Sequence, residues 1–410
     1  MRAVEIGQRS ETVRRANLSA IVRELHGHGP LSRSDLVART GLTRSAIRSL
    51  IGELAAAGLV WEERAEPLGT PGRPSPVVHP STEGAVVLAL EIAVDSLAVA
   101  LVGLGGQVLD LVRVDRPRGH TSVDEIAQDL DELVSTVRAR RPIEEDRLVG
   151  IGVAVVGVVR RTDGLVSTAP NLGWRDVPLG QRLAATLRAR VPVSIANEAD
   201  LGALAELRRG AALGVRHVLF ISGEVGVGGG AIVDGEPLTG SAGYAGEVGH
   251  IPVNPEGAAC ACGSIGCWET EIGEGALLRR AGHRASAGRD EVDAVLREGA
   301  AGSATALAAL DETGRWLGIG LAGLVNVLNP ELVVLGGLFG RMHPFVAPTV
   351  ERELERRALP APRELVRVVP ASLGVDAPVL GAAELAVEPL LADPAAWLGP
   401  RRGLADLASA

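Results

Sequence analysis

Cysteine, lysine and aromatic residues are scarce or absent in this 410-residue chain. Three cysteines are too few for the disulfide framework of a secreted protein, so a reducing, cytoplasmic location is expected. The first 20 residues lack the apolar stretch of a signal peptide. The apolar run at residues 85–103 is interrupted by Glu91 and Asp95, which argues against a membrane span. We therefore expect a protein without a membrane partner.

The absence of lysine makes arginine the only permanently cationic side chain, with 41 copies. Residues 1–80 carry 11 arginines and 8 acidic residues, a balance of +3. The remainder carries 30 arginines and 42 acidic residues, or −12, and the two parts sum to the net charge of −9. A basic head on an acidic body indicates that any contact with nucleic acid is made by the head.

The head has the pattern of a helix-turn-helix. Leu18, Ile21, Val22 and Leu25 follow the i, i+3, i+4, i+7 spacing of one helix face. A second helix is expected to start in a capping box formed by Ser32 and Asp35 and to end at Gly41. Thr43 can then cap a third helix, whose apolar stripe repeats the same spacing. Two helices joined by a one-glycine turn are typical of DNA-binding heads.

The third helix carries polar residues near its N-terminus, opposite its apolar stripe. This is where a recognition helix presents side chains to bases and phosphates. A small three-helix interaction module is the alternative interpretation. DNA binding is favoured, and the candidate contacts on this helix are Arg44, Ser45, Arg48 and Ser49.

Residues 59–78 predict a wing, because two short extended segments flank a tip rich in proline and glycine. Arg73, between Gly72 and Pro74, is a candidate for a narrow A·T-rich minor groove. The alternative is a proline-rich linker in which Arg73 is merely solvated.

From residue 81 the pattern changes to strands that alternate with helices, as in an α/β body. Strands are expected at 86–94, 97–104, 106–114, 149–159, 191–196, 217–223 and 228–235, and again within 331–340. Helices are expected at 123–140, 180–190 and 197–212. Periodicity alone leaves the topology of this body open.

All three cysteines lie within eight positions, in CACGSIGC at residues 260–267. A structural zinc site normally has four ligands, so the cluster lacks one within its own loop. The alternative is three buried thiols that behave as small apolar groups, but a loop so polar and rich in glycine offers little to bury them.

Several separated motifs resemble the ROK family of repressors, open reading frames and sugar kinases. The residues that carry the resemblance are APNLGW (169–174), NEADLGALAE (197–206), the glycine-rich stretch 226–250 that ends in GEVGH, and CACGSIGCWE (260–269). The resemblance spans residues 81–390, and the winged head matches the repressor branch. It implies an actin-like ATPase fold with two lobes around a sugar-binding cleft.

The resemblance also implies the ligands. His250 would complete a structural Zn²⁺ site, one ion per chain, with Cys260, Cys262 and Cys267. The residues that would hold sugar hydroxyls are Asn197, Glu198, Glu247, His250 and Glu269, with Asn171 as a weaker addition. Carboxylates and amides suit this task because they pair with hydroxyl groups in fixed geometry. Trp174 could stack on a sugar face or could belong to the core.

An enzyme, a ROK-type sugar kinase fused to a DNA-binding head, is the competing hypothesis. Kinases of the family have Asp-x-Gly-Gly-Thr at the first phosphate turn, where this chain has Glu91-Ile92-Ala93-Val94-Asp95. Loss of both glycines blocks the close approach of phosphate, and Asp95 would repel it. The second phosphate loop reads Glu224-Val225-Gly226 in place of Gly-Thr-Gly. A Glu at the kinase's catalytic-base position, 198, is not decisive.

We therefore expect a non-enzymatic, sugar-responsive regulator, most simply a repressor of genes for carbohydrate uptake or catabolism. It would bind a palindromic DNA operator as a homodimer or tetramer and associate with the nucleoid when bound to DNA. A DNA-binding protein whose body only dimerises is a third possibility, which the intact sugar constellation disfavours. The expected domains are a winged head at residues 1–66, a wing tip and linker at 67–80, and a sugar-sensing domain with its zinc loop at 81–410.

Overall fold

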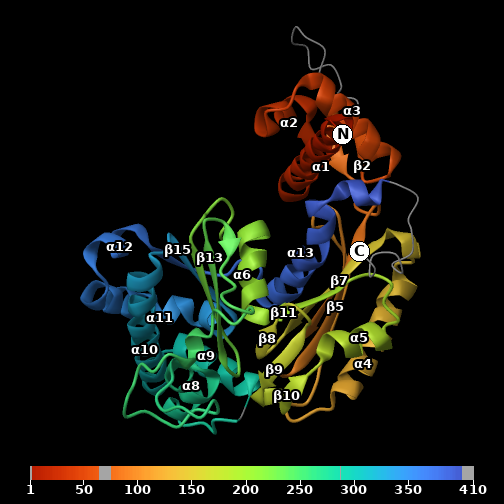
Figure 1. Cartoon of the computed structure of the whole chain (residues 1–410). Coiled ribbons are helices and arrows are strands. Elements are labelled where there is room, and N and C mark those ends of the chain that lie inside the picture. Colours follow the sequence, from red (N-terminus) through yellow and green to blue (C-terminus); the bar gives the residue numbers. More distant parts are fainter. Residues whose placement is uncertain (1, 64–74, 287, 399–410) are drawn as a thin grey trace.

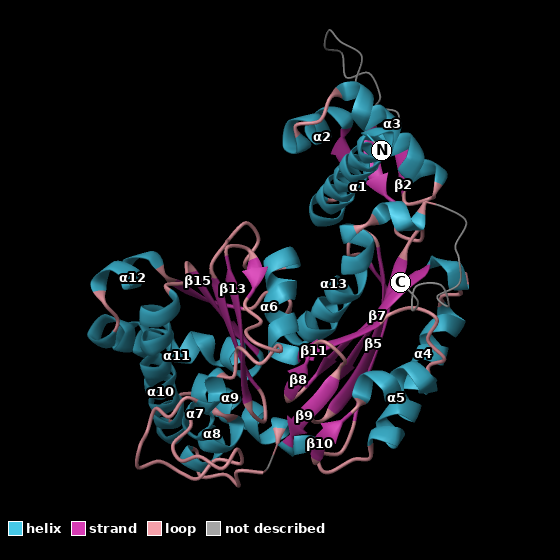
Figure 2. Ribbon diagram, in the orientation of Figure 1, coloured by secondary structure: helices cyan, strands magenta, loops and turns pink. Residues whose placement is uncertain are grey.

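The protein consists of a small head and two larger lobes, as the computed structural model shows (Figure 1). The structure describes residues 2–63, 75–286 and 288–398. Figure 2 shows that each lobe is a sheet covered by helices, whereas the head is mainly helical. Within the described residues, no helix combines the length and the apolar character that a membrane crossing needs.

The head contains the predicted helix-turn-helix. Its elements are α1 (Arg2–His28), β1 (Leu31–Ser32), α2 (Arg33–Thr40), α3 (Arg44–Ala56), β2 (Val60–Glu63) and β3 (Val77–Pro80). The capping box of Ser32 and Asp35 is present, and Thr43 accepts a hydrogen bond from the Ala46 amide to cap α3. Gly41 ends α2 in the left-handed conformation. All eight apolar residues of the two predicted stripes are buried in the head core: Leu18, Ile21, Val22, Leu25, Ile47, Leu50, Ile51 and Leu54.

The wing is a three-stranded antiparallel sheet in the order β1-β3-β2. Pairing of β2 with β3 confirms the two predicted extended segments. The small strand β1 was not predicted. The tip with Arg73, and the boundary at 66, lie outside the described residues. Because Val77–Pro80 completes this sheet, the end of the segment that we assigned to the wing tip and linker packs as part of the head.

Lobe I is built on a five-stranded sheet in the order β11-β7-β4-β5-β6. Its strands are β4 (Val86–Ile92), β5 (Ser96–Gly103), β6 (Val108–Asp115), β7 (Leu148–Val155) and β11 (Val193–Asn197). Its helices are α4 (Val123–Arg140), α5 (Leu179–Thr186) and α13 (Ala377–Ala392). A smaller sheet, β10-β9-β8, adjoins it, with β8 (Val158–Arg160), β9 (Leu165–Ala169) and β10 (Trp174–Val177).

One predicted strand, 149–159, is wrong as a single element. The chain turns at Gly157, which has a φ of 105°, and so separates β7 from β8. A side chain at such a φ would be strained, so glycine permits the turn. Apolar residues continue through the turn, and periodicity therefore could not locate it.

Lobe II has a second five-stranded sheet in the order β14-β13-β12-β15-β16. Its strands are β12 (Val218–Gly223), β13 (Val227–Val233), β14 (Glu236–Pro237), β15 (Leu332–Gly336) and β16 (Arg367–Pro370). Its helices are α6 (Glu198–Arg209), α7 (Trp268–Ile272), α8 (Glu274–Arg280), α9 (Arg289–Ala300), α10 (Ala304–Leu328), α11 (Gly337–Arg357) and α12 (Pro360–Leu365). Short 3₁₀ turns are Glu145–Arg147, Pro170–Leu172, Val248–His250, Gly374–Asp376 and Pro394–Trp397.

Two helices, α6 and α13, lie side by side between the two sheets (Figure 1). Apolar residues of α6 pack on β12 and β13 of lobe II, whereas those of α13 pack on β4 and β5 of lobe I. The head rests on α13, because the buried stripe of α1 shares one apolar core with Leu390 and Leu391. The expected arrangement of two lobes and a head is therefore confirmed, and the head is attached to lobe I by a continuous core.

Candidate functional site: the cavity between the lobes

A cavity of about 430 Å³ lies between the lobes. This volume is within the range of about 300–1,000 Å³ that small-molecule sites occupy. The six residues that the sequence assigned to a sugar all line it, although they come from both lobes and span almost 100 positions: Asn171, Asn197, Glu198, Glu247, His250 and Glu269.

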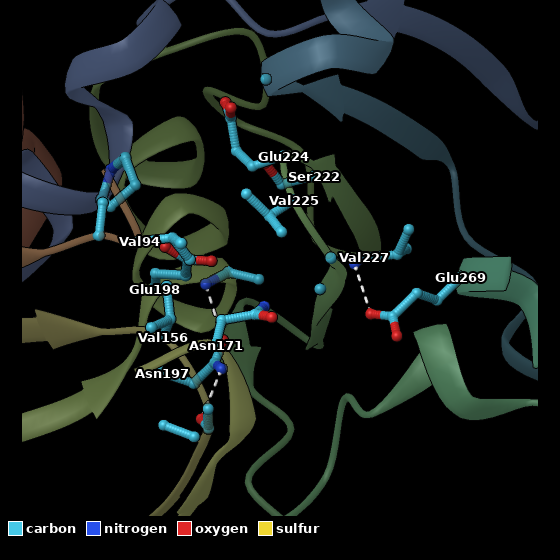
Figure 3. Close-up of a pocket in the computed structure, with 18 of the residues that line it drawn as sticks. Val94, Val156, Asn171, Asn197, Glu198, Ser222, Glu224, Val225, Val227 and Glu269 are labelled. Atoms are coloured by element: carbon cyan, nitrogen blue, oxygen red, sulfur yellow. Dashed lines mark hydrogen bonds between the residues drawn. The ribbon is translucent and has the colours of Figure 1, made fainter. Parts of the chain in front are cut away.

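Helix ends and tight turns position these side chains. Asn197 ends β11 and caps α6, and Glu198 is the first residue of α6. His250 ends the 3₁₀ turn that begins after Glu247, while Glu269 lies in the first turn of α7. Figure 3 shows Asn171, Asn197 and Glu198 on one side of the cavity and Glu269 on the other. A ligand between them would contact both lobes.

Two of these side chains are already held by backbone groups. Asn197 Oδ1 accepts from the Ala199 amide at 2.7 Å, and its Nδ2 donates to the Gly157 carbonyl at 2.9 Å (Figure 3). Glu269 Oε2 accepts from the Val227 amide at 3.1 Å. These bonds fix both side chains before any ligand arrives, which reduces the entropy that binding would cost.

Glu198 differs, since no hydrogen bond to another described residue satisfies its carboxyl group. Loss of hydration raises the pKa of Glu198 to about 8, and the nearby charges of Glu91, Glu224 and Asp95 act in the same direction. At neutral pH this group is therefore largely protonated. A protonated carboxyl can donate to a sugar hydroxyl, but it cannot act as the general base that a kinase needs.

The turn at residues 91–95, which the motif resemblance aligns with the first phosphate turn of kinases, carries ion pairs. Asp95 bonds to Arg118 at 2.9 Å and to Arg289 at 3.1 Å, so its carboxylate is not free to repel phosphate as we had expected. Arg118 also bonds to Glu274 of α8 at 2.6 Å, which joins the lobes across the cleft. The turn that would approach phosphate thus carries side chains bound to one another.

Two further carboxyl groups line the cavity. Glu91 is paired with Arg113 at 2.9 Å, yet burial raises the pKa of Glu91. Burial also raises the pKa of Glu224 to about 7, although Arg289 acts in the opposite direction. Sequence reasoning found Glu91, Asp95 and Glu224 but missed their arginine partners. No local signal could have revealed them, because Asp95 and Arg289 are 194 positions apart.

A compact group of metal ligands borders the cavity. The ligand atoms of His250, Cys260, Cys262 and Cys267 all lie within 4.8 Å of one another. His250 Nδ1 is 3.7 Å from Cys260 Sγ, and Cys262 Sγ is 3.6 Å from Cys267 Sγ. Zn–S bonds of about 2.3 Å in a tetrahedron would place sulfur atoms about 3.8 Å apart, so the group fits a four-coordinate metal.

The loop that presents these thiols is shaped by its backbone. The Cys260 amide donates to Ser264 at 2.8 Å, and the Gly266 amide donates to Ala258 at 2.9 Å. Gly266 has a φ of 66°, and a Cβ there would lie 1.5 Å from the Asn254 carbonyl oxygen. Only glycine fits that position. Use of Nδ1 for the metal leaves Nε2 of His250 for a ligand in the cavity.

The candidate DNA-contacting side chains of α3 are exposed: Arg44, Ser45, Arg48 and Ser49. In the described part of the chain, neither Arg44 nor Arg48 has an acidic partner. Neighbouring arginines of the head are neutralised, since Arg33 pairs with Glu62 and Arg39 with Glu24. The exposed face of α3 therefore carries two uncompensated positive charges.

Trp174 belongs to the core. It is 5% exposed, packs among the apolar residues of lobe I and donates from Nε1 to the Thr121 carbonyl at 2.8 Å. It does not line the cavity. Of the two interpretations that the sequence left open, stacking on a sugar is wrong.

The comparisons with known proteins agree with this geometry. The model of the ROK family matches residues 87–388, well over half of the chain. The chain belongs to the ROK family. A crystal structure described as a ROK family transcriptional regulator, a homolog of the Escherichia coli MLC protein, superposes with a TM-score of 0.75 at 25% identity, covering 93% of this chain and 97% of that one. The actin-like fold is thereby confirmed.

The relatives differ in how much of this chain they match. The xylose repressor of Bacillus spizizenii is 30% identical over 384 residues, which is 92% of this chain and 97% of that protein. The glucokinase of Halalkalibacterium halodurans is 32% identical over 309 residues, 71% of this chain and 92% of that enzyme. A Streptomyces griseus glucokinase solved with glucose and AMPPNP covers 74% of this chain at a TM-score of 0.64 and 29% identity. Of these three relatives, the xylose repressor is the one whose match extends beyond the body.

Replacing Glu198 with Gln should stabilise the ligand-free protein as the pH rises. A carboxyl with a raised pKa keeps its proton in the folded state while the unfolded chain ionises. The free energy of unfolding therefore falls as the pH rises from about 4.5 to about 8. Glutamine has no proton to lose. We expect Glu198→Gln to gain on the order of 4 kcal/mol at pH 8 and little at pH 4.5, measured by urea unfolding.

The matched control is Glu364→Gln, which changes an exposed carboxyl of α12 in the same way. It should leave the stability difference from the wild type flat across this pH range. A flat difference for Glu198→Gln as well would contradict the protonated state of Glu198.

Proposed function

We propose that this protein is a sugar-responsive transcriptional repressor that binds operator DNA through α3 and the wing. One observation carries the proposal: six polar residues suited to sugar hydroxyls converge on one cavity, and the turn aligned with the first phosphate turn of kinases carries ion pairs. A cavity of this kind binds a sugar without transferring phosphate. The similar proteins that match both head and body are named repressors.

Catalysis is disfavoured by the groups that occupy the two turns aligned with kinase phosphate loops. Asp95 and Glu224 stand where a kinase presents backbone amides to phosphate. Glu198, at the position of the catalytic base, carries a proton at neutral pH because its pKa is raised. The glucokinases among the relatives are the reason to test this point directly.

The sugar is an aldopentose or aldohexose in this proposal. Three of the similar proteins are named xylose repressors and a fourth is named a putative one, so D-xylose is the first sugar to test. D-glucose is the second, because it occupies a related kinase. The hydroxyl groups would be held by Asn197, Glu198, Glu247, His250 and Glu269, with Asn171 at the edge.

The metal is zinc in this proposal. Three thiolates and one imidazole are the ligands that zinc prefers in structural sites, and their spacing supports four-fold coordination. The ion would hold the loop 260–267 and orient His250 toward the sugar.

The operator is a near-palindrome read by a homodimer or tetramer. Each α3 would enter one major groove, with half-sites about 34 Å apart. Arg73 would reach the minor groove beside it. The protein would act in the cytoplasm, on the nucleoid, with a winged head that includes β3 and so extends to Pro80, and with its sensing domain at 81–410.

Metal analysis tests the zinc site. We expect about one zinc per chain by mass spectrometry of the purified protein. Cys262→Ser should lose the ion and weaken sugar binding by tenfold or more, because loss of a ligand frees the loop that orients His250. Ser264→Ala, in the same loop but with all four ligands, should keep both. Full sugar binding by metal-free protein would contradict this role.

The DNA surface is tested with a duplex selected from a randomised library by the wild-type protein. Arg44→Ala and Arg48→Ala should each weaken binding by about 1–3 kcal/mol in fluorescence anisotropy, as expected for a lost base contact. Arg284→Ala removes an exposed arginine from lobe II and should change nothing. Unaltered affinity in both helix variants would place the recognition surface elsewhere.

A coupled assay separates sensor from kinase. The protein should bind D-xylose or D-glucose in calorimetry and yet form no sugar phosphate with ATP and magnesium. Glu198→Ala, which removes the carboxyl group, should abolish the effect of sugar on DNA binding while sugar-free DNA affinity stays nearly unchanged; His250→Ala should do more harm, since it also removes a metal ligand. Sugar-dependent ATP turnover that Glu198→Gln removes would restore the enzyme.

A further inference from the structure

The head, lobe I and lobe II meet at one buried cluster of side chains, remote from the zinc loop. Its members are His26 near the end of α1, Glu384 in α13 and Arg209 at the end of α6. Each belongs to a different part of the molecule. Buried ionic groups are costly unless they are fully paired, so such a cluster is informative about what it joins.

The three side chains contact one another directly. Glu384 Oε2 accepts from His26 Nε2 at 2.9 Å, and its Oε1 accepts from Arg209 Nε at 2.8 Å. The Gly105 amide donates to His26 Nδ1 at 3.1 Å, and His26 Nε2 also lies 2.7 Å from Arg209 Nη2. Arg209 also donates to the carbonyls of His26 and Gly105, at 3.1 and 2.9 Å. Although burial acts to raise the pKa of Glu384, His26 and Arg209 lower it to about 2, so the carboxylate is charged.

The cluster is connected to the cavity through α6. Glu198, which lines the cavity, is the first residue of this helix, and Arg209 is the last. Twelve helical residues span about 18 Å, so a shift of α6 at the cavity is delivered to Arg209 at the other end.

The second helix, α13, also begins at the cavity, where Ala377 and Pro378 line the wall. It touches α6 backbone to backbone, since a Cβ on Gly381 would lie 1.9 Å from the Leu201 carbonyl oxygen. Because α6 packs on lobe II and α13 on lobe I, any change in the angle between the lobes must move one helix against the other.

We propose that the His26–Glu384–Arg209 cluster is the junction through which sugar occupancy of the cavity sets the position of the DNA-binding head. This inference rests on the proposed function. Arg209 moves with lobe II and Glu384 moves with lobe I. His26 bonds to Glu384, so a shift of one lobe against the other changes the position of α1. The three residues contact neither sugar nor DNA, so they position the head and do not bind a ligand.

The test replaces both charges by apolar groups of similar length, in Arg209→Met combined with Glu384→Met. Removing a buried pair together avoids the unpaired charge that a single substitution would leave. The readouts are D-xylose affinity with and without the selected duplex, and duplex affinity with and without D-xylose. These give one coupling factor measured in two directions, which must agree.

The double variant should fold, keep D-xylose affinity within about threefold and lose at least fivefold of the wild-type coupling factor, given that couplings are typically about 5–150-fold. His26→Gln should lose coupling in the same direction. A purely structural role would lower stability without changing the coupling factor of the folded protein.

A matched control is available about one helical turn away, between α1 and α13. Arg23 of α1 pairs with Glu388 of α13, in contact with neither α6 nor the buried cluster. Arg23→Met combined with Glu388→Met should keep the wild-type coupling factor. Equal coupling in the wild type and the Arg209/Glu384 variant, or equal losses in the two double variants, would overturn the junction. A wild type that binds D-xylose without any change in duplex affinity would instead refute the proposed function, and the junction with it.

Discussion

The contact between α6 and α13 is the constraint on which the remainder of this structure depends. The two helices approach so closely at Gly381 and Leu201 that no side chain fits between them. Each is fixed by an apolar face to a different sheet. This helix pair therefore joins the lobes, and both helices start at the cavity. A ligand that contacts both walls acts where both helices begin. A small change in the angle between the lobes there produces a larger displacement at the far ends of the helices.

Ion pairs provide a second connection between the lobes, beside the cavity. Asp95 pairs with Arg118 and Arg289, and Arg118 pairs with Glu274, so charged groups link the lobes beside the cavity. A kinase must leave that space open for ATP. A sensor can use this space for contacts that favour one arrangement of the lobes. The sugar then opposes or reinforces that preference, depending on which of the two lobe arrangements it binds more tightly.

Local patterns predicted much of this molecule. The caps at Ser32 and Thr43, the buried stripe of α3 and the full length of α4 follow from spacing within a few turns. The ligand set of the metal cluster came from motif resemblance, and the structure brings it together. The break at Gly157 was missed, because apolar residues on both sides hide a turn that only a backbone angle reveals. The strand β1 is too short for any periodicity.

What sequence could not supply are the partners of buried charges. Glu384 and His26 are 358 positions apart, and Arg209 lies 175 positions from Glu384, so each reads as an ordinary polar residue of its own helix. Only the fold shows that one carboxylate serves two helices from other parts of the chain. The same distinction applies to function. Motifs identify the groups that can touch a sugar, whereas the path from that sugar to the head is a property of packing. That path can be seen only in the fold, where the head, lobe I and lobe II meet at the buried carboxylate of Glu384.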